Sequence, residues 1–185
     1  MRNWLFLTLV AGFLTTAQAG FSSFNCAFPD DPAIASHQWI FTPYEVPQDG
    51  NLGELALVET MKQYAPDQVI MSGQTDIDPT FMVTKTVTNE TTFTWTSYQL
   101  TLAGDATFVG TPYSDVFGLV NMPDSHNVIF SAPQSVAPGQ SVTMHAFINI
   151  PDSGNFNFTM TQLAVPEPAT LGLLCLGALS LRRRR

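Results

Sequence analysis

The chain has 185 residues and a formal net charge of −8, from 7 basic and 15 acidic residues. A strongly acidic surface repels nucleic-acid phosphate and anionic lipid, so the composition excludes nucleic acid as a partner. Two cysteines are too few for a disulfide scaffold, so a hydrophobic core must hold the fold.

The first 19 residues have the three regions of a secretory signal peptide. Arg2 supplies the positive charge, an apolar core follows from Trp4 to Leu14, and Ala17 and Ala19 form the small-residue exit. This order predicts that signal peptidase cuts between Ala19 and Gly20, so that the rest of the chain is exported.

Residues 20–164 are predicted to form a single extracellular domain of 145 residues. Its only basic residues are Lys62 and Lys85, against fourteen acidic ones, so its formal charge is −12. Its only cysteine is Cys26, which leaves no disulfide within the domain.

The first half of this domain gives short or ambiguous signals. Residues 39–41 and 68–71 are short strand candidates. Residues 54–64 fit a helix through Leu55, Val58 and Met61, or a strand through Leu55 and Leu57, and the pattern leaves both open.

Two strands are predicted at 81–88 and 92–102, around a polar turn at Asn89-Glu90. In the second, Trp95 shares a face with Phe93, which predicts a core position, whereas Tyr98 falls on the opposite parity with Leu100 and Leu102. A bulge near Thr96-Ser97 would reconcile the two phases.

The clearest alternation lies near the end of the domain. Shorter candidates at 117–120 and 128–131 precede it, and apolar residues then occupy every second position over 140–150 and 155–163. Turn residues at 151–154 predict that these two strands form a hairpin or are near neighbours in an antiparallel sheet. Eight or so short strands, with 13 prolines and 12 glycines, predict an all-β fold, an antiparallel β-sandwich.

The C-terminal residues 165–185 combine three parts. Val165-Pro166-Glu167-Pro168 is a rigid polar step, residues 169–181 are uncharged and apolar, and the chain closes with Arg182, Arg183, Arg184 and Arg185. An apolar segment that ends in arginines stops in a bilayer with the arginines on the cytoplasmic side. Thirteen helical residues span about 20 Å, against about 30 Å of hydrocarbon, so this short transmembrane helix anchors weakly.

This order of parts resembles the PEP-CTERM protein-sorting tail of bacterial exported proteins. The resemblance implies that an exosortase recognises Pro166-Glu167-Pro168 and that this chain is its substrate, held briefly at the inner membrane before release to the cell surface or exterior. The two prolines fix φ, so we expect the motif to be extended and accessible at the membrane surface.

Signs of catalytic or metal chemistry are weak. His37, His126 and His145 form no metal-binding or catalytic motif, and no Gly-x-Ser-x-Gly elbow is present. Asp76 and Asp78 could offer oxygen ligands to Ca²⁺, but a full site needs six or more, so a solvated turn is favoured. We therefore expect no enzyme and no cofactor.

Three function classes remain at this stage. The leading one is a non-enzymatic surface or extracellular-matrix protein, associated with exopolysaccharide. The alternative is a calcium-assisted polysaccharide-binding module, for which Tyr98 and Tyr113 are candidate glycan contacts. A hydrolase ranks last, because the sequence offers no recognisable site.

Overall fold

The computed structural model describes residues 20–29, 34–151 and 154–167. The predicted signal peptide, including Ala17 and Ala19, lies outside this part of the chain. So do Pro168, the predicted transmembrane helix and the four terminal arginines. No helix within the described ranges is long and apolar enough to cross a membrane.

The described chain is all-β, as the alternating patterns predicted. It contains eleven strands: β1 (Phe21–Ala27), β2 (Ile34–Gln48), β3 (Asn51–Met61), β4 (Asp67–Thr75), β5 (Thr80–Asn89), β6 (Trp95–Ala103), β7 (Thr107–Ser114), β8 (Leu119–Asp124), β9 (Asn127–Val136), β10 (Ser141–Asn149) and β11 (Gly154–Pro166). Residues 54–64 had fitted either a helix or a strand. The structure shows a strand, β3, up to Met61, and its residues alternate between buried and more exposed positions.

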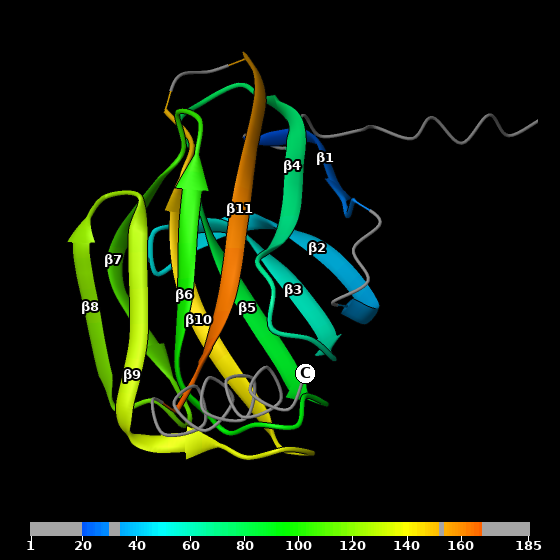
Figure 1. Ribbon diagram of the computed structural model, residues 1–185. Helices are drawn as coiled ribbons and strands as arrows, with labels where there is room; N and C mark the ends of the chain where they lie inside the picture. Colours follow the sequence, from blue (N-terminus) through cyan, green and yellow to red (C-terminus); the bar gives the residue numbers. More distant parts are fainter. Residues whose placement is uncertain (1–19, 30–33, 152–153, 168–185) are drawn as a thin grey trace, which may run out of the picture.

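The strands form two sheets that pack face to face (Figure 1). One sheet has the order β1-β4-β11-β6-β9-β8, and all its pairs are antiparallel. The other has the order β2-β3-β5-β10-β7, in which β3 and β5 run parallel. The prediction of a purely antiparallel sandwich is therefore wrong for one pair. The intervening β4 lies in the opposite sheet, and the chain returns beside β3 in the same direction.

One predicted neighbour relation is also wrong. Strands β10 and β11 were expected to form a hairpin or to be near neighbours in an antiparallel sheet, but they belong to different sheets. Strands β5 and β6, which flank the turn at Asn89-Glu90, also lie in different sheets. Turn residues show that the chain reverses, but they do not show which sheet the next strand joins. A true two-residue hairpin joins β2 to β3, where Asp49 and Gly50 both take positive φ, as such tight turns require.

The core lies between the sheets and confirms the predicted faces of the strands. Every second residue from Val142 to Ile150 is buried, and so are Phe158, Met160 and Trp95. The register of β6 shifts between Trp95 and Ser97, which confirms the predicted bulge. This bulge lets Trp95 and Tyr98, which have opposite parity, both point into the core.

Candidate functional site

The beginning of the Pro-Glu-Pro motif is part of the fold. Strand β11 lies between β4 and β6 and continues through Val165 and Pro166, which pair with Ser97 and Trp95. The domain boundary predicted at Ala164 therefore falls inside a strand. The motif starts in a central strand of the six-stranded sheet, without an intervening linker.

Pro166 interrupts the ladder because proline has no N–H to donate. The register shifts between Val165 and Pro166, and the Glu167 N–H then donates to the Thr94 carbonyl at 3.1 Å. The expected extended conformation is confirmed for Val165 and Pro166. The expected accessibility of the motif is not confirmed, because Pro166 is buried and Val165 and Glu167 are half-buried.

The comparison with protein families identifies this region. The family model described as the PEP-CTERM protein-sorting motif matches residues 164–185. The chain carries a PEP-CTERM sorting tail. The motif indicates an exported protein that an exosortase processes, with an anchored stage before secretion. Neither the curated proteins nor the solved structures gave a match to the chain.

At the other end of the described chain, Gly20 is fixed to the turn after β4. Its backbone N–H donates to Asp76 Oδ1 at 2.7 Å, and the Asp76 N–H donates to the Gly20 carbonyl at 3.1 Å. Asp76 therefore holds the residue at which the mature chain is predicted to begin. Among the described residues, no group of three or more His, Cys, Asp or Glu side chains could hold a metal ion.

The two tyrosines predicted as glycan contacts differ in their exposure to solvent. Tyr98 is fully buried, and its hydroxyl donates to Gln162 Oε1 at 2.6 Å. The prediction for Tyr98 is therefore wrong, because no polysaccharide can reach it. Its parity with Leu100 and Leu102 was a signal of this burial. Tyr113 is 49% exposed and stacks on His145, with 4.3 Å between the ring centroids.

Tyr113 ends a row of side chains that crosses all five strands of the mixed sheet on its outer face. The row is Tyr44 on β2, Glu54 on β3, Thr84 on β5, His145 on β10 and Tyr113 on β7. Tyr44 and Thr84 donate to the two oxygens of Glu54 at 3.3 and 2.6 Å, and Thr84 Oγ1 lies 3.2 Å from His145 Nδ1. Partial burial lowers the pKa of His145, so the imidazole favours its neutral form.

A cleft of about 640 Å³ lies beside this row, within the size range of small-molecule sites. Tyr44 and Tyr113 both line it, together with Met82 and Phe147 from the central strands and the Asp49-Gly50 turn. Sequence reasoning found Tyr113 but missed Tyr44 and the row, because these residues come together only through the strand order.

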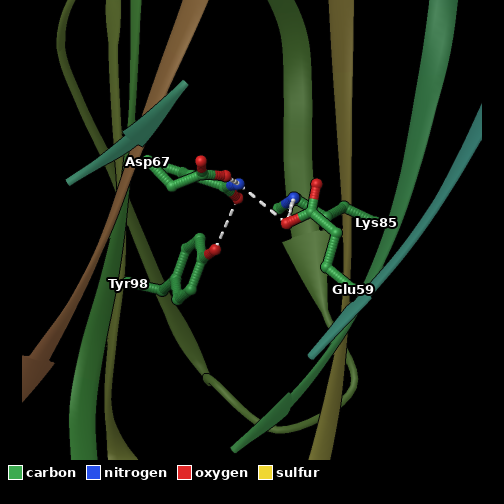
Figure 2. A network of polar contacts seen from close by, with 5 residues as sticks. Glu59, Asp67, Lys85 and Tyr98 are labelled. Atoms are coloured by element: carbon green, nitrogen blue, oxygen red, sulfur yellow. Dashed lines mark hydrogen bonds and ion pairs between the residues drawn. The ribbon is translucent and has the colours of Figure 1, made fainter. Parts of the chain in front are cut away.

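A second polar cluster, which we call the inner cluster, lies between the two sheets and consists of Glu59, Asp67, Lys85, Tyr98 and Gln162 (Figure 2). Lys85 Nζ lies 2.6 Å from Glu59 Oε2, and both side chains are fully buried. Gln162 Nε2 donates to Glu59 Oε2 at 2.7 Å and also to Asp67 Oδ2. Glu59 and Lys85 come from the mixed sheet, and Asp67, Tyr98 and Gln162 from the antiparallel one.

Burial dominates the electrostatics of this cluster. It raises the pKa of Asp67, and the nearby Glu59 carboxylate raises it further, although the hydrogen bond from Gln162 opposes the shift. The pKa of Tyr98 is also well above its ordinary value because of burial. Burial beside Glu59 raises the pKa of the Cys26 thiol to about 12, which makes this thiol unreactive.

Sequence reasoning missed the inner cluster, although the signal was present. Glu59 is in phase with Leu55 and Leu57, and Lys85 is in phase with Val83 and Val87. A charged residue on the apolar face of a strand is the pattern that would have revealed both.

Proposed function

We propose that the chain is a non-enzymatic surface or extracellular-matrix protein, delivered to the cell exterior through exosortase processing of its C-terminal tail. The observation that supports this most is the sorting-motif match at residues 164–185. The joining of the motif to the domain also fits a substrate role, because strand β11 presents the tail directly at the end of the sheet.

The pairing of β11 supports a proposal for the position of the cut. A cut before Val165 would remove the last pairs of β11 with β6 and uncover the buried Pro166 position. We expect the cut to lie after Pro166, in the part of the tail that leaves the sheet. The released domain then keeps a complete β11.

Recognition can be tested with Glu167→Ala, which removes the charge but keeps the backbone N–H that bonds to Thr94. We expect the variant to accumulate uncut in the membrane fraction, and we expect the same of the wild type in a host without the exosortase. Glu90→Ala is the matched control, because Glu90 is a half-exposed acid elsewhere. Normal processing of the wild type in the exosortase-deficient host would refute the proposal.

A polysaccharide-binding role is the second candidate, supported by the cleft that Tyr44 and Tyr113 line. Exposed aromatic rings offer flat apolar surface with a polar tip, which suits the faces of sugar rings. Retention of the mature protein on exopolysaccharide from its host tests this role. We expect Tyr113→Ala to lower retention at least tenfold, about 1.4 kcal/mol. Tyr64→Ala is the control, since Tyr64 is similarly exposed outside the cleft. Equal retention of both variants would exclude the cleft.

A further inference from the structure

Burial of the charged groups of the inner cluster costs free energy. Taking a carboxylate and an ammonium out of water costs several kcal/mol per ion, and an apolar pair of similar size is often as stable. Beyond its ion pair, Lys85 Nζ has no hydrogen-bond partner among the described residues, and neither have Glu59 Oε1 and Asp67 Oδ1. A purely structural polar network would normally satisfy these atoms.

We propose that Lys85 and Gln162 join in an intramolecular isopeptide bond once the domain has folded. The bond would link Nζ of Lys85 to Cδ of Gln162 and release ammonia. This inference rests on the inner cluster alone, so it does not depend on export or on exosortase processing.

The contacts of Gln162 match what an acyl acceptor needs. The Tyr98 hydroxyl donates to Oε1 at 2.6 Å, where negative charge develops when a nucleophile adds to the carbonyl carbon. The amide nitrogen, which must leave, is held by the carboxylates of Glu59 and Asp67. The side-chain amide is therefore polarised and fixed before any reaction.

Glu59 connects the nucleophile to the leaving group. Its Oε2 is 2.6 Å from Lys85 Nζ and 2.7 Å from Gln162 Nε2, so one oxygen contacts both nitrogens. Hydrogen-bond distance to both atoms is what a proton shuttle requires.

The step balances without an added reagent. Glu59 takes a proton from the Lys85 ammonium, and the lone pair of the resulting amine forms the new bond to Cδ of Gln162. Glu59 returns that proton to Nε2 and accepts another from Nζ. The old carbon–nitrogen bond then breaks with its electron pair on Nε2, and neutral ammonia leaves. The products are a secondary amide and a protonated Glu59.

Gln162 is a better partner for Lys85 than either carboxyl group. Glu59 lies between the two nitrogens, where it serves as the base. Asp67 contacts the amide nitrogen of Gln162, and among the described residues the ion pair of Lys85 is with Glu59 and not with Asp67. Condensation with either acid would release water, which gives a different change in mass.

The bond would connect the two sheets. Lys85 is on β5, and Gln162 is on β11, the strand that leads into the sorting tail. A cross-link of this kind would close a long loop covalently, as a disulfide does elsewhere. Residues 20–164 have only Cys26 and cannot form an internal disulfide.

The test is mass spectrometry of the full chain purified from cells and then denatured. We expect the mass to be about 17 Da, one ammonia, below that of the sequence as processed. Lys62 and Lys85 are the only trypsin sites in residues 20–164. We expect trypsin to cut after Lys62 but not after Lys85, and the fragmentation spectrum to place the link at Gln162.

Variants separate the roles of the neighbours. Glu59→Gln should abolish the mass loss, and Tyr98→Phe should slow its appearance by about 100-fold, as expected when one oxyanion donor is removed. Lys62→Arg, at an exposed site, should leave it unchanged. Because Glu59→Gln could fail to fold, the wild-type mass and digest decide the question. An unchanged mass, a loss of about 18 Da, or cutting after Lys85 would overturn the proposal.

Discussion

The outer-face row and the inner cluster are built from the same two central strands but have opposite surroundings. β3 contributes Glu54 to the row and Glu59 to the cluster, while β5 contributes the adjacent residues Thr84 and Lys85. Neighbouring residues of a strand point to opposite faces of the sheet. A shift of one position therefore decides whether a polar residue joins a partly exposed row or a buried network.

The largest expected effect concerns the buried charge of the inner cluster, compared with an exposed ion pair elsewhere on the domain. Lys85→Ala leaves Glu59 buried without its partner and also prevents the proposed cross-link, so we expect the free energy of unfolding to fall by at least about 3–5 kcal/mol. The control is Lys62→Ala, whose lysine is 54% exposed in a 3.9 Å pair with Glu90, and which should change stability by less than about 0.5 kcal/mol. Urea unfolding measures both. Similar values would mean that the inner pair is not buried as described.

Removal of one hydroxyl gives the next largest contrast. Tyr98→Phe leaves Gln162 Oε1 without its buried donor, which should cost about 1–3 kcal/mol. Tyr113→Phe removes a hydroxyl from a half-exposed ring and should be neutral within about 0.5 kcal/mol. Thermal unfolding of the two variants checks this. A larger loss in Tyr113→Phe would show that the outer row contributes more to stability than the inner cluster.

Burial of Asp67 should make the free energy of unfolding depend on pH. The pKa of Asp67 in the folded state is above its ordinary value of 3.8 because the side chain is buried. Its contribution to stability is therefore fully present below pH 3.8 and is lost as the pH rises through the folded-state pKa. We expect Asp67→Asn to gain stability relative to the wild type over this range. Unfolding curves at a series of pH values would show a constant difference if the prediction were wrong.

His145, in the outer-face row, should give the opposite dependence of stability on pH. The effect should be smaller because this side chain is partly solvated. The pKa of His145 is lowered from 6.5, so its contribution is present above pH 6.5 and is lost as the pH falls toward the folded-state pKa. His145→Gln should therefore gain on the wild type as the pH falls below 6.5. NMR titration of the imidazole measures the pKa directly. A value above 6.5 would contradict the burial of His145 between Tyr113 and Thr84.

The local parts of the structure were predictable from the sequence. The alternation in β10 and β11 identified their buried faces, and the change of parity in β6 located the bulge at Thr96. The sorting tail was also identified from residues alone, because its parts are contiguous. Each of these features depends on spacing within one segment.

The strand order was not predictable, and the sites depend on it. Glu59 and Gln162 are 103 positions apart, and only the packing of β3 against β11 brings them together. Tyr44 and Tyr113 meet in one cleft because β2, β3, β5, β10 and β7 are neighbours in that order. Single-strand periodicity contains no information on which strands pair.

The most direct test of the whole account is the intact mass of the protein recovered from outside its native host. We predict a chain that begins at Gly20, ends after Pro166 within the tail, and is about 17 Da lighter than that sequence. Material found in the cytosol with both ends uncut and with the full mass of 185 residues would contradict it.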